Sequence, residues 1–319
     1  MTRQLDYNKD QLLVMYKKVN PSLLKTNGGR FERRRASLFK ALSLPRQMFK
    51  GKSIIDLGGG TGEKLFFYSS LGCVNCTLVE PNEISVNYAK KLFRKTPLKT
   101  INTPLEDFEM STIKQYDIVS CEGVIHHLKN PESILKKILH NLGKNAMFIF
   151  AVNESNAWYL RHLQRLFVRT YGNNDEKLMI VVAKKYLANH LRLAVRKGLR
   201  SQKAVIYDTF VNPRINTLDL EAICKIFKSK NMSYHSSYPT LRNPFSLIQH
   251  SEPKPDEFDY EKNRVYYQKL EVIWKGGGKN LGGLEKRIKN KNLTRNDLKK
   301  IQTGYLGHGL SYFVGVKSE

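Results

Sequence analysis

Short apolar runs alternate with amphipathic segments between residues 51 and 153. The runs SIIDL, CTLVE, YDIVSC and AMFIFAV have the length of strands, and the segments between them repeat apolar residues three and four positions apart, as helices do. A strand followed by a helix, repeated in this way, is typical of a parallel sheet covered by helices on both faces. We therefore predict a doubly wound, Rossmann-like α/β core over residues 51–153.

The pattern differs on either side of this core. Residues 1–50 contain the basic run GGRFERRR among apolar residues at helical spacing, which predicts a helical N-terminal extension. Over residues 154–216 apolar residues again recur at helical spacing. A helix around Trp158 to Phe167 and a second one from about Asp175 to Arg200 are expected there. We interpret these helices as an insertion that forms a lid.

The C-terminal part, residues 217–319, returns to the sheet. Thr217 to Lys230 predicts an amphipathic helix capped by Thr217, SYHSSYPTL predicts a strand, and LSYFVGV predicts a final strand that closes the edge of the sheet. Between these strands, residues 242–308 are polar and rich in Pro and Gly, which indicates a long insertion.

The first predicted strand runs directly into a glycine turn, Asp56-Leu57-Gly58-Gly59-Gly60-Thr61-Gly62. Glycine permits positive φ and lets a ligand approach the main chain, so this turn predicts the floor of a binding site. A phosphate-binding P-loop would need a second glycine where Glu63 stands. A dinucleotide-binding turn would need its third glycine at the same position, and the charge of Glu63 would oppose a pyrophosphate. Both alternatives are excluded.

The remaining D-x-G-x-G-x-G form resembles the class I S-adenosylmethionine-dependent methyltransferases. Three further segments resemble that family in the same order: LVEPN after the second strand, LEDF after the third and SCEGVIHHL after the fourth. The resemblance covers about residues 50–153. More weakly, YDTFVNPRINTLDLEAICKIF and LSYFVGVKS are similar to small-molecule methyltransferases of the ubiquinone-biosynthesis type. Gly59 stands where the family often has Cys or Ala.

The resemblance implies a seven-stranded, mostly parallel sheet with an antiparallel last strand, and S-adenosylmethionine as the cofactor. It places Glu80 at the two ribose hydroxyls, which a carboxylate suits because each of its oxygens can accept a hydrogen bond. Leu105 and Glu106 would lie at the adenine, and Cys121 and Val124 at the methionine and methyl end. The cofactor-binding residues expected from the whole set are Asp56, Gly58, Gly60, Gly62, Glu80, Leu105, Glu106, Cys121 and Val124.

The histidines at the end of the fourth strand are the candidates for catalysis. His126 and His127 lie beside the expected methyl site, and an imidazole that titrates near neutral pH can deprotonate an acceptor. The alternative is that one histidine packs at the start of the helix while the other faces solvent. Cys73 and Cys76 form a CxxC without a second pair or a suitably placed histidine, so no metal site is expected.

Charge adds a question about partners. The chain carries 54 Lys+Arg against 28 Asp+Glu, a formal net charge of +26, which would attract an anionic metabolite, nucleic acid or anionic lipid. A codon bias towards lysine in an AT-rich genome would explain the same excess without a partner. No apolar run reaches the length of a membrane span, and four cysteines with no leader-like start indicate a reduced, cytoplasmic setting.

Two classes of acceptor stay open. The lid and the ubiquinone-type resemblance favour a small-molecule acceptor, which the basic charge would allow to be anionic. An RNA acceptor is the alternative, supported by charge alone. The fourth strand ends in SCEG and lacks the (D/N)PP(Y/F/W) signature of adenine-N6 methyltransferases, and no Pro-Cys nucleophile occurs. A cofactor-binding protein without activity is disfavoured because the cofactor segments are complete.

Overall fold

The computed structural model describes six stretches of the chain, residues 9–19, 29–198, 201–241, 258–276, 281–302 and 310–318. Their contacts divide the chain into two compact units. We call them the helical unit and the sheet unit. The helical unit draws on residues 1–27, 156–215 and 270–309, and the sheet unit on residues 28–155, 216–269 and 310–319.

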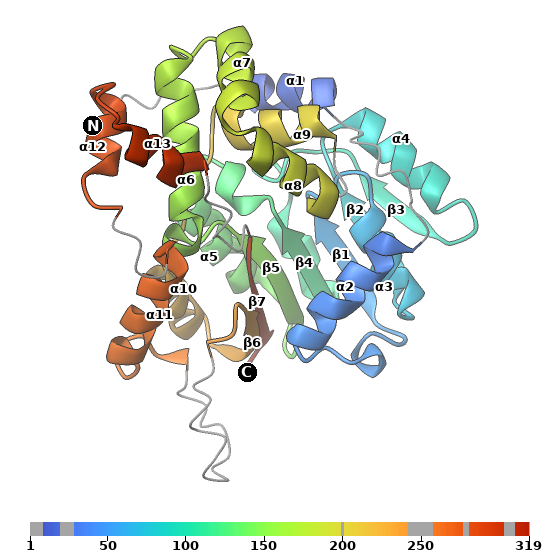
Figure 1. Cartoon of the computed structure of the whole chain (residues 1–319). Helices are drawn as coiled ribbons and strands as arrows, with labels where there is room; N and C mark the ends of the chain where they lie inside the picture. The colour runs from blue at the N-terminus through green and yellow to red at the C-terminus, as the bar shows by residue number, and fades with distance from the viewer. Residues whose placement is uncertain are drawn as a thin grey trace. The chain divides into compact units, whose positions relative to one another are not determined.

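The sheet unit contains the seven-stranded sheet that the sequence predicts, with the strand order β3-β2-β1-β4-β5-β7-β6 (Figure 1). The strands β1 to β5 are parallel, and β7 is antiparallel to both of its neighbours. Their bounds are β1 Ser53–Leu57, β2 Val74–Val79, β3 Leu98–Ile101, β4 Ile118–Glu122, β5 Met147–Val152, β6 Met232–Tyr238 and β7 Ser311–Lys317.

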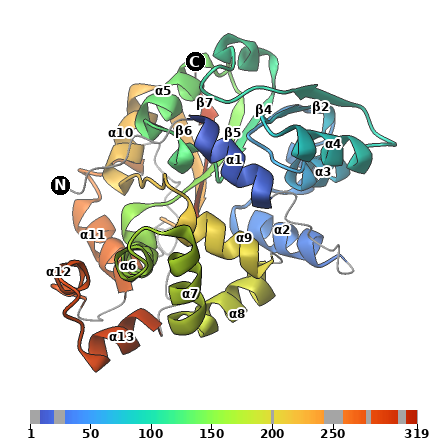
Figure 2. The ribbon, with the colours of Figure 1, turned by 90° about the horizontal axis from the view of Figure 1, so that it is seen from above.

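Helices cover both faces of this sheet, with α2 and α3 on one side and α5 and α10 on the other (Figure 2). Alternate residues of the central strands supply the two cores, because side chains of a strand point to opposite faces. Ile54 and Ile149 pack with α2, α3 and α4, whereas Phe150 contacts Phe227 of α10. The helices are α2 Arg30–Ala41, α3 Glu63–Ser70, α4 Glu83–Leu92, α5 Pro131–Asn141 and α10 Leu220–Ser229, with short helices η1 Arg46–Met48, η2 Met110–Gln115 and η3 Ile125–His127.

The last strand does not close the edge of the sheet, and that prediction was wrong. β7 lies between β5 and β6, and β6 forms the edge. The composition of the two strands explains the order. The sequence of β7, SYFVGVK, is mostly apolar, and three of its central residues are buried. β6 reads MSYHSSY, and a polar strand of this kind is suited to the edge of a sheet, where the backbone hydrogen-bonding groups on one side have no partner strand.

The helix predicted from Thr217 begins later, at Leu220, with Asp219 as its N-cap. Residues 217 and 218 are extended because they pair with the chain that leaves β5. The Leu218 amide donates to the Asn153 carbonyl at 3.0 Å, and the Ser155 hydroxyl donates to Thr217 Oγ1 at 3.1 Å. Tertiary pairing therefore overrides the capping signal of Thr217.

The helical unit has its own apolar core, built from α1 with the helices of the inserted segments. The single helix expected from about Asp175 to Arg200 is two helices, because the backbone leaves helical geometry at the buried Leu187 (φ −116°, ψ 24°). Within residues 242–308, where the sequence predicts a long insertion, the described parts contain three helices. The bounds are α1 Lys9–Val19, α6 Ser155–Tyr171, α7 Glu176–Tyr186, α8 Ala188–Gly198, α9 Gln202–Ile206, η4 Tyr207–Val211, α11 Arg264–Gly276 (which runs from the sheet unit into the helical unit), α12 Leu284–Lys289 and α13 Arg295–Gln302.

None of the helices in the described parts of the chain is long and apolar enough to cross a membrane. The predicted division into residues 1–50, 51–153, 154–216 and 217–319 stays a prediction, because the two units are assembled from segments that are distant in the sequence.

Candidate functional site

The glycine turn between β1 and α3 has the backbone that its sequence predicts. Gly58, Gly60 and Gly62 have φ of +70°, +58° and +78°, in the left-handed region that side chains disfavour. The Gly58 amide donates to the Val79 carbonyl at 2.8 Å, which ties the turn to the end of β2. The turn therefore lies at the carboxyl ends of two adjacent parallel strands, where α/β proteins place their ligands.

Two of these glycines differ in what surrounds them. A Cβ on Gly58 would lie 2.6 Å from Val124 Cγ2, so the turn packs directly against the segment that follows β4. A Cβ on Gly60 would meet no atom within 4 Å. Gly59 has no such room, because a Cβ there would lie 2.5 Å from Asp56 Oδ2. The same Cβ would lie 2.4 Å from Leu78 Cδ1, so a larger residue at position 59 would require the side chains of Leu78 and Asp56 to shift.

Glu80 follows β2 and points back at the glycine turn. Its Oε2 accepts from the Gly60 amide and its Oε1 from the Asn82 amide, both at 3.0 Å. Burial raises the pKa of Glu80, and these two amide hydrogen bonds act in the opposite direction. The two amides orient the carboxylate, and each oxygen keeps a further lone pair for a ligand.

Asp56 is fully buried at the end of β1. Neither of its carboxylate oxygens has a hydrogen-bond partner among the described residues. Burial raises the pKa of Asp56, and the nearby charge of Lys64 opposes that shift. A buried carboxylate without a donor is costly, so this position fits a ligand that brings a donor or a positive charge.

The remaining residues predicted for the cofactor are placed around the same strand ends. Leu105 is buried and Glu106 is exposed in the loop after β3, while Cys121 is fully buried within β4. Val124 is partly exposed and touches the glycine turn at Gly58, as described above. The structure thus shows contacts that connect Gly58 with Val124 and Gly60 with Glu80. It shows no such contact for Glu106.

His126 and His127 lie in the 3₁₀ helix η3 directly after β4, and both are buried. Their ring centroids are 4.1 Å apart. Asn216 holds the backbone of this turn, because its amide N–H donates to the His126 carbonyl at 2.8 Å and its Nδ2 donates to the Leu128 carbonyl at 2.7 Å. The alternative in which one histidine faces solvent is therefore wrong.

A buried ionic network next to this turn was not predicted from the sequence. Arg35 of α2 binds the carboxylate of Glu122 with both terminal nitrogens, at 2.5 and 2.8 Å. The Tyr68 hydroxyl donates to the same carboxylate at 2.8 Å, and Lys64 Nζ donates to the Glu122 carbonyl at 2.6 Å. The network joins helix α2 to the last residue of β4.

The charges and hydrogen bonds of this network stabilise the ionised forms of Glu122 and Arg35. Burial alone would raise the pKa of Glu122, but the charges of Arg35 and Lys64, with the hydrogen bonds from Arg35 and Tyr68, lower it to about 2. Glu122 in turn holds the pKa of Arg35 above its ordinary value against the effect of burial. The rings of Phe39, Phe67 and Tyr68 lie 4.9 to 5.7 Å from the guanidinium carbon.

The only signal for the network in the sequence is the basic run GGRFERRR, which does not say which arginine is buried. In the structure Arg35 is 6% exposed, whereas Arg33 and Arg34 lie on the exposed side of α2.

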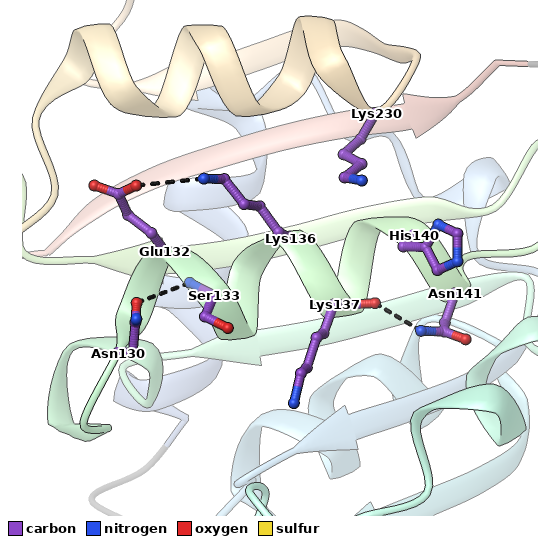
Figure 3. Close-up of a pocket in the computed structure, with 8 residues that line it drawn as sticks. All are labelled: Asn130, Glu132, Ser133, Lys136, Lys137, His140, Asn141 and Lys230. Carbon is purple, nitrogen blue, oxygen red and sulfur yellow. Dashed lines mark hydrogen bonds and ion pairs between the residues drawn. The ribbon is translucent and has the colours of Figure 1, made fainter.

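Two other features do not belong to this site. Within the described residues no cluster of three or more His, Cys, Asp or Glu side chains is arranged to hold a metal, and Cys73 and Cys76 are buried free thiols. A hollow along α5 is lined by polar side chains (Figure 3). None of the predicted site residues lines it: the lining is Asn130, Glu132, Ser133, Lys136, Lys137, His140, Asn141 and Lys230.

A family model described as a methyltransferase domain matches residues 29–231, which is nearly two thirds of the chain. The chain belongs to this methyltransferase family. It is a class I enzyme that depends on S-adenosylmethionine, as the glycine turn and the ordered segments after the strands predict. The match does not single out the ubiquinone-biosynthesis subtype.

Individual relatives of the methyltransferase are distant. A protein of Haemophilus influenzae, named only as uncharacterized, is 23% identical over 191 residues, which cover 58% of this chain and 69% of the relative. The probable (S)-tetrahydroprotoberberine N-methyltransferase 2 of Papaver bracteatum is 27% identical over 128 residues, and the match spans 35% of this chain and 36% of the poppy protein. The solved structure of the plantazolicin methyltransferase BpumL in complex with SAH is similar to this chain, with a sequence identity of 16% and a TM-score of 0.46. The match covers 97% of this chain and 95% of the BpumL chain.

Proposed function

We propose that this methyltransferase binds S-adenosylmethionine across the glycine turn and Glu80 and transfers its methyl group to a small-molecule acceptor. The observation that carries the cofactor site is the pairing of Glu80 with the Gly60 amide, at the one glycine of the turn that faces open space. The carboxylate is already fixed by two amides, so a ribose diol would find its acceptors oriented before binding.

Four residues of the proposed site have roles that their geometry supports. Glu80 accepts from the ribose hydroxyls, and the buried carboxylate of Asp56 takes the positive end of the methionine part. Val124 packs on Gly58 of the turn and would contact the methyl end of the cofactor. Leu105 supplies an apolar surface for the adenine, and Glu106 and Cys121 stay the less supported members of the predicted set.

When bound, S-adenosylmethionine would supply a methyl group made electrophilic by its sulfonium: an acceptor that attacks this carbon in line takes the methyl group, and S-adenosylhomocysteine leaves with the electron pair of the broken C–S bond. The protein has to align the acceptor and exclude water, and alignment alone can contribute about 7 to 11 kcal/mol. His126 and His127, buried at the methyl end and held by Asn216, are the groups available to accept a proton from the acceptor.

The small-molecule acceptor is supported by the poppy relative, whose name is that of a probable (S)-tetrahydroprotoberberine N-methyltransferase. The net charge of +26 is compatible with an anionic acceptor. The test is to incubate the enzyme with S-adenosylmethionine labelled in the methyl group and a cell extract separated into a small-molecule and an RNA fraction. We expect label in the small-molecule fraction, and label confined to RNA would contradict the proposal. We place the reaction in the cytoplasm, where the four free cysteines would stay reduced.

Replacing Glu80 by alanine is expected to weaken cofactor binding by about 1 to 3 kcal/mol, because the ribose diol loses its acceptors. Calorimetric titration with S-adenosylhomocysteine measures the change. Glu109→Ala, at an exposed position, is the matched control and should leave the affinity unchanged. Equal affinities of the Glu80 variant and the wild type would move the ribose contact elsewhere.

The two histidines are tested by separating transfer from binding. We expect His126→Ala or His127→Ala to slow methyl transfer by about 100-fold or more, the usual contribution of a general base, while calorimetry shows unchanged cofactor affinity. Rescue of the slower variant by added imidazole would support proton transfer. Wild-type rates in both variants would end the general-base proposal.

A further inference from the structure

The charge of the chain is unevenly distributed between the two units. The segments of the helical unit carry 26 Lys+Arg against 8 Asp+Glu, a net charge of +18. Those of the sheet unit carry 28 against 20, a net charge of +8, although they hold 192 of the 319 residues. A bias in codon usage acts on both units alike and would leave about 10 of the 26 charges in the helical unit. The excess therefore belongs to that unit.

On helix α7 the basic side chains lie on the same face as exposed aliphatic side chains. Its outward side chains are Lys177, Leu178, Val181, Lys184 and Lys185, all exposed, opposite the buried Met179 and Ala183. At 3.6 residues per turn these five occupy about a third of the helix circumference. The face has no acidic residue, because Glu176 lies to its side and accepts a hydrogen bond from the Tyr207 hydroxyl at 2.6 Å.

The exposed apolar side chains of the unit are aliphatic. Leu178 and Val181 are 46% and 58% exposed. Val14, Val272 and Ile273 are exposed as well, and no aromatic side chain of the helical unit is among the large exposed hydrophobics of the described residues. Single-stranded nucleic acid is usually bound by exposed aromatic rings together with basic residues. Exposed aliphatic side chains between lysines fit a lipid surface, since the chains enter the acyl boundary while the lysines reach the headgroups.

We propose that the outward face of α7 is a docking surface for a bilayer of anionic phospholipids. The net charge of +18 draws the helical unit to such a surface, and Leu178 and Val181 insert into it. The binding is peripheral and depends on salt, because each lysine near an anionic surface contributes separately and is screened within a Debye length. This inference does not depend on which acceptor the enzyme methylates.

The test is sedimentation of the full chain with vesicles of phosphatidylcholine alone and of phosphatidylcholine mixed with phosphatidylglycerol. We expect binding to the mixed vesicles only, decreasing with salt. Changing Lys184 and Lys185 together to glutamine should lower the partition coefficient about 30-fold, from the usual contribution of a lysine at such a surface. Changing Leu178 and Val181 together to serine should lower it about tenfold or more while leaving the charge unchanged.

The sheet unit offers matched controls for both changes. Lys136 and Lys137 are two adjacent lysines on α5, beside the hollow of Figure 3, and their change to glutamine removes the same charge from the other unit. Val74→Ser removes an aliphatic side chain that is 46% exposed. Both control variants should bind the mixed vesicles as the wild type does.

Three results would overturn the proposal. The first is equal binding to both kinds of vesicle or to neither. The second is an equal loss in the α5 lysine variant, which would mean attraction by total charge without a docking face. The third is full binding by the Leu178 and Val181 double variant, with displacement of the protein from vesicles by a single-stranded RNA oligonucleotide, which would assign the basic unit to nucleic acid. Circular dichroism of each variant shows whether it is folded.

Discussion

Gly60→Arg is expected to abolish binding of S-adenosylmethionine while the protein stays folded. Gly60 has open space where a side chain would begin, so an arginine does not displace protein atoms, but it occupies the volume beside Glu80 that the cofactor needs. Its positive φ adds strain of about 1 to 3 kcal/mol, which a domain of this size tolerates. Calorimetry with S-adenosylmethionine measures the loss of binding.

Gly51→Arg is the matched control for this substitution. Gly51 has a φ of +73° and open space around its Cβ position, and it precedes β1 at the opposite end of the strand from the glycine turn. The two variants therefore have the same backbone strain and the same added charge. They differ only in whether the arginine lies in the glycine turn or at the opposite end of β1. Wild-type affinity in the Gly60 variant, or equal loss in both, would contradict the site.

Breaking the buried pair of Arg35 and Glu122 is expected to destabilise the protein by about 3 kcal/mol or more, because either change leaves an uncompensated buried charge. Arg35→Met and Glu122→Gln each remove one partner. The double variant should lose less than the sum of the two, since no unpaired charge remains. Denaturant unfolding measures all three, with Lys225→Met, from an exposed ion pair, as the control that should not change stability. Additive losses would contradict the coupling.

The same network has a predictable pH dependence. The pKa of Glu122 is about 2 in the folded protein, below its ordinary value of 4.5, so its contribution is fully present above pH 4.5 and is lost as the pH falls towards 2. Asp56 and Glu80 have raised pKa values, so their contributions to stability increase as the pH falls. The stability difference between the wild type and Glu122→Gln isolates the first effect and should shrink on acidification through this range.

The core of the sheet unit could be predicted because its signals are local. The run AMFIFAV is apolar along its whole length and SIIDL is apolar at three of its five positions, as expected for strands buried on both faces. The glycines at 58, 60 and 62 have the positive φ that their spacing indicates. Asn130 and Pro131 begin α5, where the side chain of Asn130 accepts from the Ser133 amide.

What could not be predicted depends on contacts between distant segments. Arg35 and Glu122 are 87 positions apart, and nothing in the basic run around Arg35 distinguishes the buried arginine from its exposed neighbours. Thr217 is a good capping residue that instead pairs with the chain after β5, and β7 enters the sheet between two strands that precede it. The helical unit combines three segments, and so its concentration of charge is invisible along the sequence.

The proposed cofactor site is tested most directly by a crystal structure of the chain grown with S-adenosylhomocysteine. We predict that the ribose hydroxyls will lie within hydrogen-bonding distance of the Glu80 carboxylate, with the amino-acid end of the ligand near Asp56 and its sulfur facing His126 and His127. A ligand bound at another place, or a glycine turn that takes a nicotinamide dinucleotide in preference, would contradict it.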